Sequence, residues 1–552
     1  MAWDHRLRRA CVGVLAVVLC LTGAVAVQAQ TTSASLYGSA KDAQGAVLPG
    51  AEVTLTSATQ GTVMSVVTDA MGNFVFPIIR PDTYTLKVSL EGFQSVQRTP
   101  VVVNANDRLD VGAFTLQVGS LTESVTVTGR AADIQLRSGE RAYTMEAAAM
   151  QNIAVNGRSF FGLAALVPGV VTGSAEPTQV DAFNVNGARA TQNNMTVDGV
   201  ANIDTGNNGG NMAITNLDAI SEFKVLTSSF QAEYGRAIGG QVQVVTKSGT
   251  QDFSGSAYWY ARRSDWNANT WLNNRSGSDL PKSERNDRGY TVGGPIYIPG
   301  LFNTSKNKLF FFWNQEFQRR KDPVSEQRVT VPTALERKGD FSQSVDANGR
   351  PYPYIRDYTT GLPCSATDTS GCFQDGGVLG KIPANRLYQP TLQALNLYPM
   401  PNAAGQVGYN YKSQTPGSSP LNQIMARVDY QVNNNWRLTG RYMGHSNKSE
   451  LPYGIGGWSI RSNLDTIQVI ADVPGRNVMF SGTGVLNNTT SMEFSFGQGH
   501  NSLDHITESE LMTRSGAGLT GVPLLYPSAV QMDLIPQFQY GGGRIANQPF
   551  FN

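Results

Sequence analysis

Side chains that could carry out catalysis or bind a metal are few and widely spaced in this chain. Its four histidines are His5, His445, His500 and His505, and none stands in a His-Glu-x-x-His zinc motif. His500 and His505 are five positions apart in a segment expected to be extended, so their side chains point to opposite faces. No local motif marks out a pair of carboxylates for glycoside hydrolysis. The sequence therefore predicts no catalytic residues, no metal site and no cofactor.

The composition narrows the class of protein further. The chain has 552 residues, with 43 Lys plus Arg against 42 Asp plus Glu and a formal net charge of +1. This balance gives no electrostatic basis for a nucleic-acid partner, whose recognition depends on a basic surface. Charged residues make up 15% of the chain and apolar residues 40%, unlike a charge-driven disordered protein. We expect several folded domains.

The N-terminus has the order of a secretory signal peptide. Arg6, Arg8 and Arg9 precede an apolar run that ends in small residues. Residues 1–29 are therefore expected to be removed, so that the mature chain begins near Gln30, outside the cytoplasm. The alternative is an uncleaved anchor helix. After this segment there is no run of 18 or more apolar residues that could cross a bilayer as a helix.

Two of the four cysteines remain after the signal peptide. Cys364 and Cys372 flank a short polar segment in a compartment that allows disulfides. Because no histidine and no second cysteine pair lies nearby in the sequence, a disulfide that closes a loop is favoured over a metal site.

Residues 30–119 contain short β-rich segments separated by glycine turns. About seven such segments in fewer than ninety residues predict a β-sandwich, with strands at 36–40, 51–57, 63–68, 74–78, 84–89, 94–103 and 108–116. Asp42-x-x-Gly45 and Asp69-x-x-Gly72 predict turns in which the Asp side chain accepts backbone hydrogen bonds. Calcium binding is the alternative, but each turn offers only one carboxylate.

The sequence around these turns resembles the carboxypeptidase regulatory-like domain. The matching residues are Gly38, Asp42-x-x-Gly45, 48–51, 68–74 and 81–86. The resemblance implies a transthyretin-like sandwich, grouped with carbohydrate-binding-like folds. It implies no peptidase here, and sugar binding would rest on analogy of fold alone.

A short run of alternating β-branched residues, 120–130, follows this domain. Its central residues are Thr122, Glu123, Ser124, Val125, Thr126, Val127 and Thr128. An isolated strand of this kind can join the edge of a partner's sheet, and a plain linker strand is the alternative. The run resembles the TonB box of outer-membrane transporters, which implies the periplasmic protein TonB as a partner.

Residues 131–250 contain five motifs in the order found in the plug domain of TonB-dependent receptors. They are Asn186-Gly187-Ala188-Arg189, Val197-Asp198-Gly199, Ile220-x-x-Phe223-x-Val225-Leu226, Tyr234-Gly235-Arg236-x-x-Gly239-Gly240 and the strand 241–247. Each motif alone is common, but five in order are specific. The resemblance implies a small α/β plug that closes a barrel. We also expect a short helix over 158–167 and an exposed polar loop over 202–211.

From residue 251 onward, apolar and polar residues alternate in segments of about ten residues, the length of a tilted membrane strand. Seven strands are expected at about 253–263, 287–298, 308–320, 422–432, 436–446, 475–486 and 491–501. A soluble sandwich also alternates, but here long and short connections alternate as well, which is typical of outer-membrane barrels. Outer-membrane lipid is therefore the expected surrounding, and the cysteine pair falls in a loop outside the cell.

Segments 331–342, 382–386 and 398–402 of the longest loop resemble the Oar-like barrel proteins, which are large TonB-dependent receptors with an N-terminal carboxypeptidase regulatory-like domain. This resemblance implies a transporter that binds an extracellular ligand, such as a glycan, a peptide or a metal chelate, and imports it by plug movement. The alternative is an adhesion or structural surface protein that is anchored by the barrel.

The expected fold class is mainly β. It combines a transthyretin-like (carbohydrate-binding-like) β-sandwich, a small α/β plug domain and the N-terminal part of an antiparallel transmembrane β-barrel. The expected location is the outer membrane of a Gram-negative-type bacterium, with the sandwich in the periplasm. Seven strands are odd in number, whereas plugged transporters have about 22. We therefore expect 251–552 to be an incomplete barrel from a parent of roughly 1,200 residues, unable to insert stably alone.

Overall fold

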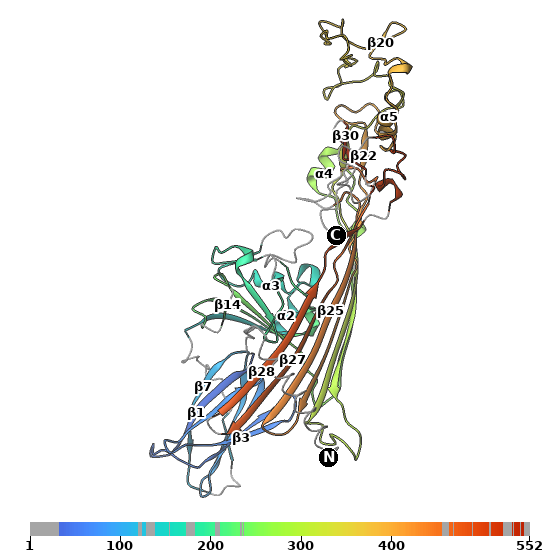
Figure 1. Cartoon of the computed structure of the whole chain (residues 1–552). Coiled ribbons are helices and arrows are strands. Elements are labelled where there is room, and N and C mark those ends of the chain that lie inside the picture. Colours follow the sequence, from blue (N-terminus) through green and yellow to red (C-terminus); the bar gives the residue numbers. More distant parts are fainter. Residues whose placement is uncertain are drawn as a thin grey trace, which may run out of the picture.

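The computed structural model shows a sandwich, a plug, a large curved sheet and a loop region (Figure 1). It describes residues 32–119, 139–153, 155–172, 183–204, 210–231, 234–235, 237–454, 463–466, 468–487, 490–506, 509–522, 533 and 535–540, and the backbone of 124–127 and 543–545. The predicted signal peptide, 1–29, lies outside the described residues. The sandwich and the loop region that contains β20 lie at opposite ends of the molecule (Figure 1).

The N-terminal domain is a sandwich of two sheets, and all seven expected strands are present. One sheet has the order β4-β1-β7 and consists of β1 (Ala34–Asp42), β4 (Asn73–Ile79) and β7 (Arg108–Leu116). The other has the order β3-β2-β5-β6-β8 and consists of β2 (Glu52–Ser57), β3 (Val63–Val67), β5 (Asp82–Ser89), β6 (Ser95–Val103) and β8 (Ser124–Val127). Alternate apolar residues of both sheets, including Leu36, Leu55 and Phe76, form its buried core.

The two Asp-x-x-Gly turns have the expected geometry. Asp42 Oδ1 accepts hydrogen bonds from the backbone N–H groups of Gln44 and Ala46, at 2.9 and 2.8 Å. Asp69 makes the same pair of contacts in its own turn, at 2.9 and 2.8 Å. The carboxylates therefore serve the backbone. Among the described residues, no cluster of three or more His, Cys, Asp or Glu could hold a metal ion.

The plug is built on one five-stranded sheet in the order β13-β12-β15-β14-β9. Its strands are β9 (Arg141–Glu146), β12 (Asn194–Val197), β13 (Val200–Ala201), β14 (Ile220–Ser228) and β15 (Gln241–Thr246). Beside it lie the hairpin β10 (Val170–Thr172) with β11 (Phe183–Val185), the helices α2 (Ala147–Asn152) and α3 (Phe161–Ala164), and the 3-10 turns η1 (Asn156–Arg158), η2 (Ala190–Gln192) and η3 (Leu217–Ala219).

Two local expectations for the plug need correction. The helix expected over 158–167 is only α3, because Arg158 has a φ of 52° and the chain turns again at Gly169 with a φ of 85°. Asn202, at the start of the loop expected to be exposed, is fully buried. Its side-chain amide bonds both backbone groups of Ala213, at 2.8 and 3.0 Å, so hydrogen bonding replaces solvent there. Residues 205–209 of this loop lie outside the described residues.

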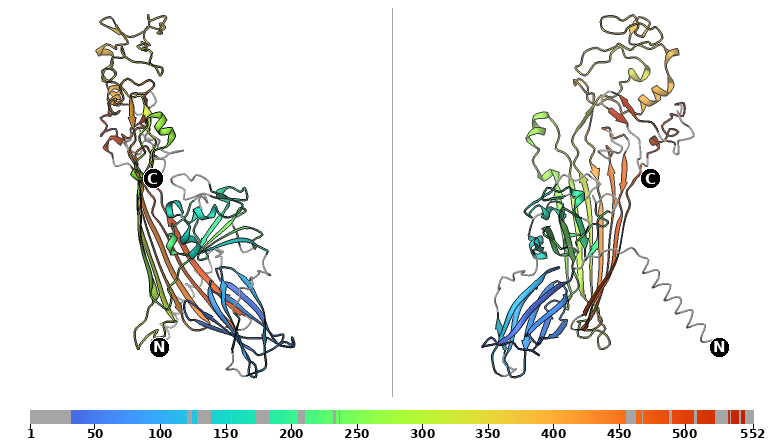
Figure 2. Two further views of the ribbon diagram at one scale, coloured as in Figure 1. Left: turned by 180° about the vertical axis from the view of Figure 1, so that it is seen from behind. Right: turned by 60° about the vertical axis from the view of Figure 1, so that its left-hand side comes forward.

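The curved sheet contains the seven expected long strands, each antiparallel to the next. They are β16 (Ser254–Arg263), β17 (Glu284–Pro295), β18 (Leu309–Asp322), β24 (Leu421–Gln431), β25 (Trp436–Leu451), β27 (Gly475–Asn487) and β28 (Thr490–Asn501). Within the described part of the chain, β16 pairs only with β17 and β28 only with β27, so the sheet is open. The plug lies against its concave face (Figure 2).

The two faces of this sheet differ in chemistry as the alternation predicts. The register aligns Val292, Trp313, Ala426, Tyr442 and Val478 across five strands on the outward face. The exposed residues of that face are largely aromatic or aliphatic, which suits lipid. The other face is polar yet buried, and it contains Asn314, Glu316, Gln318, Gln423, Arg427, Asp429, Thr439, Arg441 and Asn477.

The loop region beyond the sheet has a small core of its own, which includes Val331, Leu464, Leu519 and Ile535. Its strands are β19 (Gln327–Val329), β20 (Gln374–Asp375), β21 (Val378–Leu379), β22 (Tyr411–Ser413), β30 (Phe538–Tyr540) and β31 (Gly543–Ile545). The short strands β23 (Gly417–Ser418), β26 (Val469–Asp472) and β29 (Asp504–Ile506) extend the curved sheet itself. The helices of the loop region are α4 (Trp271–Ser276), α5 (Gln389–Asn396), η4 (Ser264–Trp266), η5 (Glu336–Lys338), η6 (Ala384–Arg386) and η7 (Glu510–Met512). No helix in the described ranges is both long and apolar enough to span a membrane.

Candidate functional site

The plug is held against the sheet by a buried carboxylate, Asp198, in the turn after β12. Arg427 on β24 and Arg441 on β25 approach its two oxygens at 3.3 and 2.8 Å. The backbone N–H and hydroxyl of Thr246 also donate to Asp198, at 2.9 and 2.8 Å. Both arginines and the aspartate are more than nine-tenths buried. Such a charge-assisted network is costly to open, because each separated charge would lose its partner away from water.

Asp429 continues this network along the wall. It receives Arg427 Nε at 3.0 Å, Arg437 Nη2 at 2.7 Å and the hydroxyl of Thr439 at 2.8 Å. Ser248, where the plug leads into the barrel, donates its hydroxyl to the same carboxylate. Three arginines of the wall thus contact two aspartates, Asp198 of the plug and Asp429 of the wall.

A second contact between plug and wall surrounds Arg158. Its guanidinium lies 2.9 Å from Glu316 of β18 and also pairs with Asp218 of the plug. The rings of Tyr258 and Tyr260 lie 4.3 and 4.8 Å from the guanidinium carbon, which is cation–π distance. Burial disfavours the charge of Arg158, but the neighbouring carboxylates outweigh burial and raise its pKa above the usual value. Arg158 therefore stays charged.

The sandwich docks on the plug through the turn between β6 and β7. The backbone N–H of Ala105 donates to both oxygens of Glu222, at 3.1 and 3.0 Å, and Lys224 Nζ donates to the carbonyl of Ala105 at 2.9 Å. Lys224 also lies 3.5 Å from Asp107 and 3.2 Å from Glu140. Since Lys224 is 1% exposed, this is a buried cation among three carboxylates.

Burial raises the pKa of Glu222 to about 7, although the Ala105 N–H and the charge of Lys224 act in the opposite direction. Asp107 and Glu146 add to the rise, because a second negative charge disfavours ionisation. The carboxyl that receives the sandwich therefore titrates near neutral pH.

Two further polar contacts complete the docking surface. Asn106, whose φ is 58°, donates from Nδ2 to Gln243 Oε1 at 2.9 Å. Arg108 donates to the side chain of Gln231. Nearby, Gln60 of the sandwich donates to Ser248 and to the carbonyl of Gly249, at 3.0 and 2.9 Å. The sandwich thus contacts the plug and the chain that enters β16.

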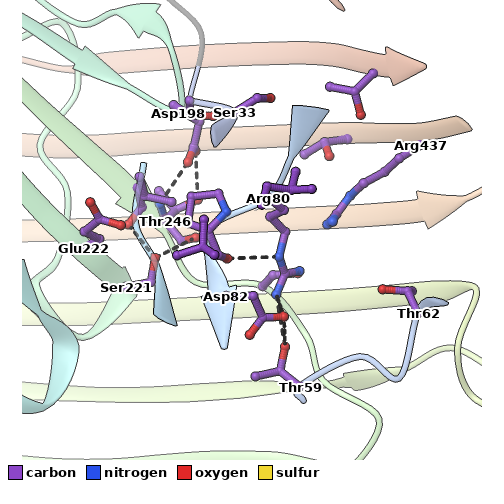
Figure 3. Close-up of a pocket in the computed structure, with 18 of the residues that line it drawn as sticks. Ser33, Thr59, Thr62, Arg80, Asp82, Asp198, Ser221, Glu222, Thr246 and Arg437 are labelled. Atoms are coloured by element: carbon purple, nitrogen blue, oxygen red, sulfur yellow. Dashed lines mark hydrogen bonds and ion pairs between the residues drawn. The ribbon is translucent and has the colours of Figure 1, made fainter. Parts of the chain in front are cut away.

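A cavity of about 650 Å³ lies where sandwich, plug and sheet meet. Figure 3 shows Arg80 with Asp82 and Thr59 of the sandwich, and Asp198 with Thr246 at the plug. Arg437 enters from the wall (Figure 3). Burial lowers the pKa of Lys247, which also lines this space. The ionic contact between plug and wall therefore borders a polar cavity.

The two groups of residues that the sequence predicts as sites lie in different parts of the structure. Ser124, Val125, Thr126 and Val127 form β8, whose backbone pairs in parallel with β6, whereas Thr122, Glu123 and Thr128 lie outside the described residues. Cys364 and Cys372 form a disulfide with a Cα–Cα distance of 4.9 Å, in the loop region remote from the sandwich.

Sequence reasoning singled out none of the plug's buried ionic residues as functional. Asp198 was visible only as part of a Val-Asp-Gly turn, and Arg427 and Arg441 only as members of a polar strand face. Arg427 and Arg441 lie on the inward face of adjacent strands. Two buried arginines need a carboxylate beside them, and this requirement is the signal that could have pointed to Asp198. Lys224 gave no signal, because a single lysine in a strand does not indicate by itself that it is buried or which groups it contacts.

A sheet with an apolar outer face, whose polar inner face holds a separate domain through ion pairs, defines a plugged outer-membrane β-barrel. Residues 245–552, more than half of the chain, match the family model described as "Outer membrane beta barrel domain", and the chain belongs to this family. Residues 35–117 match the carboxypeptidase regulatory-like domain and residues 138–241 the TonB-dependent receptor plug domain. These matches identify a TonB-dependent receptor of the Gram-negative outer membrane, a non-enzymatic class.

Among characterised relatives, the TonB-dependent transporter Oar of Myxococcus xanthus is 29% identical over 310 residues, covering 50% of this chain and 27% of Oar. Two solved structures are more distant. The outer membrane transporter YddB from Escherichia coli has 10% identity and a TM-score of 0.40, over 67% of this chain and 40% of YddB. The siderophore receptor PirA from Acinetobacter baumannii has 14% identity and a TM-score of 0.31, over 64% and 47%. The chain thus spans less than half the length of each.

Proposed function

We propose that the protein is a TonB-dependent transporter, which binds an extracellular ligand and imports it by displacing its plug. The observation that carries this proposal is the contact between plug and wall at Asp198. A plug fixed by a few buried ion pairs is stable at rest, yet it can be opened by a force applied at one point.

The proposed point of force is the TonB-box-like segment, residues 122–128, captured as an added strand by TonB in the periplasm. A pull there would reach the plug at Glu140 and Arg141. The Lys224 contact with Glu140 would carry load first. β9 is an edge strand that pairs only with β14 among the described strands, and its Arg141 end would separate before its Glu146 end. Plug opening would therefore begin at β9.

The domain limits that we propose are a signal peptide at 1–29, the sandwich at 30–119, the TonB-box-like segment at 120–130, the plug at 131–250 and the barrel at 251–552. With the sandwich in the periplasm, the loop region and its disulfide lie outside the cell, where an oxidising environment keeps the bond. The ligand would bind there and at the plug. Its class, whether glycan, peptide or metal chelate, is set by these loops.

The test is deletion of residues 121–129 from the protein expressed from its own gene. We expect energised uptake to be lost, while the amount of protein in the outer membrane is unchanged. A matched control deletes nine residues, 366–370 and 402–405, from the outer loops and keeps the segment intact; TonB binding should survive it. Uptake that persists without residues 121–129, or that needs no proton-motive force, would contradict the transport proposal and favour a surface anchor.

A further inference from the structure

The described part of the TonB-box-like segment, Ser124–Val127, belongs to the sandwich sheet. β8 forms the last strand of the order β3-β2-β5-β6-β8 and runs parallel to β6. The register pairs Ser95 with Ser124, Val96 with Val125, Gln97 with Thr126 and Arg98 with Val127. The segment expected to meet a partner is therefore already paired with a strand of its own chain.

The pairing of β6 with β8 covers only the first part of β6, from Ser95 to Arg98. Pro100, two residues further along β6, has no N–H to donate to a neighbouring strand. At the other end the chain is fixed beside the start of β6, because Gln94 N–H donates to Gln117 O at 2.8 Å and Gly119 N–H to Gly92 O at 3.1 Å. The receiving edge thus begins at an anchor and ends before a proline.

The covalent connection favours this pairing without making it strong. Only residues 120–123 separate Gly119 from Ser124, so β8 meets β6 at a high effective concentration. The ladder itself has four residue pairs and is parallel, which is slightly less stable per residue than an antiparallel ladder. A partner protein that offers a longer strand can therefore replace β6 as the strand paired with β8.

The holder of the segment is itself attached to the plug. The turn that follows β6 contains Ala105 and Asp107, which contact Glu222 and Lys224 of β14. β14 also pairs with β9, the plug strand nearest to the segment along the chain. Ser124–Val127 thus pair with β6, the first plug strand pairs with β14, and the turn after β6 contacts β14.

We propose that the sandwich holds the TonB-box-like segment on the edge of β6. TonB can then bind this segment and pull on the plug only after β8 has separated from β6. Alternate residues of a strand direct their N–H and C=O groups to opposite edges, so half of those of β8 are already used. While β8 is hydrogen-bonded to β6, a force applied to β8 is transmitted to the sandwich instead of to β9. This inference rests on the proposed function, since it assigns the segment the same partner.

The first test is a cross-link in the full receptor within outer-membrane vesicles. Gln97 and Thr126 are opposite each other in the register, so Gln97→Cys with Thr126→Cys should form a disulfide on mild oxidation. The control is Thr54→Cys with Thr126→Cys, because β2 is separated from β8 by β5 and β6. The control pair should not cross-link. Equal cross-linking of both pairs, or of neither, would overturn the assignment of β8 to β6.

The second test measures binding of the purified periplasmic domain of TonB. We expect the oxidised Gln97→Cys/Thr126→Cys receptor to bind at least about tenfold more weakly than its reduced form, because the segment can no longer leave β6. Uptake should stop on oxidation and return with reductant, and the control pair treated identically should show neither change. Equal binding by the oxidised and reduced receptors would overturn the proposal.

A synthetic peptide of residues 121–129 separates this inference from the proposed function. If the peptide does not bind the TonB domain, the proposed function fails. If the peptide binds but the locked receptor binds equally well, only the holding role of the sandwich fails.

Discussion

The plug has two ionic interfaces that use different chemistry. Against the barrel wall, Arg427 and Arg441 share the carboxylate of Asp198. Against the sandwich, Lys224 and Glu222 hold the backbone of Ala105. Arginine keeps its charge at any physiological pH and offers several donors in a fixed plane, whereas lysine is a point charge on a flexible stem. With a pKa of about 7, Glu222 changes charge near neutrality.

This difference indicates that the two interfaces serve different purposes. The wall contact is built to persist until force is applied, because opening it separates buried charges from their partners. The sandwich contact includes a carboxyl that titrates near neutral pH, so we expect it to loosen while the plug stays in place. Amide hydrogen exchange can compare the two directly, since the Thr246 N–H donates to Asp198 and the Ala105 N–H donates to Glu222.

The largest expected effect is at the wall. Asp198→Ala leaves two buried guanidinium groups without their shared carboxylate, which should lower the free energy of opening of β15 by about 3 to 5 kcal/mol. Hydrogen exchange of the β15 peptide in the membrane-embedded receptor measures this loss. Asp252→Ala, at an exposed position, is the matched control and should change nothing. If β15 is equally protected from exchange in Asp198→Ala and in the unaltered receptor, the wall contact does not hold the plug in place.

A smaller effect is expected at the sandwich. Lys224→Met leaves three carboxylates without their buried cation, but the hydrogen bonds from the Ala105 N–H to Glu222 remain, so we expect a loss of about 2 to 3 kcal/mol. Exchange of the peptide with residues 104–107 should speed up, while β15 keeps its protection. Lys87→Met, on the exposed side of β5, is the control. Equal loss at both interfaces would show that they are not independent.

The pH dependence should separate the interfaces further. In the docked structure burial raises the pKa of Glu222 from 4.5 to about 7, so this carboxyl binds a proton more tightly than it does in an open state that exposes it to water. Docking is therefore favoured at low pH and weakens as the pH rises from about 4.5 through about 7, by roughly 1 to 2 kcal/mol. Glu222→Gln should abolish this dependence at the Ala105 peptide. After correction for intrinsic exchange, a slope retained in Glu222→Gln would exclude Glu222 as its source.

The smallest expected effect concerns one backbone conformation. Asn106 has a φ of 58°, a region that glycine and asparagine occupy more readily than other residues. Both Asn106→Gly and Asn106→Ala lose the hydrogen bond to Gln243, but only Ala adds strain. Docking should be weaker in Asn106→Ala than in Asn106→Gly by about 1 kcal/mol. Indistinguishable exchange of the two variants would mean that the turn relaxes.

The sequence allowed most of the fold to be predicted, because alternation with a period of two is a property of each strand alone. It predicted the barrel strand at 253–263, observed as β16 (Ser254–Arg263), and the one at 491–501, observed as β28 (Thr490–Asn501). β25 runs to Leu451 rather than to 446, because its outer end pairs with β26, a short strand that extends the sheet. That extension depends on a partner strand and leaves no mark in the alternation.

The candidate site was predictable only in its parts. The polar face of β24 and β25 could be read from alternation, but its partner Asp198 lies 229 residues from Arg427 along the chain. Nothing local in the sequence joins them, since a buried charge selects its partner by position in space. The same holds for Lys224, which occupies an inward strand position where the docked sandwich supplies the Ala105 carbonyl and the Asp107 carboxylate, and the start of the plug supplies Glu140.

The sequence by itself determined the strands, their two faces, the turns and the order of the domains, because propensity and alternation act over a few neighbouring residues. The tertiary structure decided which faces meet. It paired Asp198 with Arg427 and Arg441, inserted Ala105 between Glu222 and Lys224, and laid β8 along β6. Those choices depend on burial, which pairs a charge or an unpaired strand edge with whatever complementary group the folded chain brings within reach.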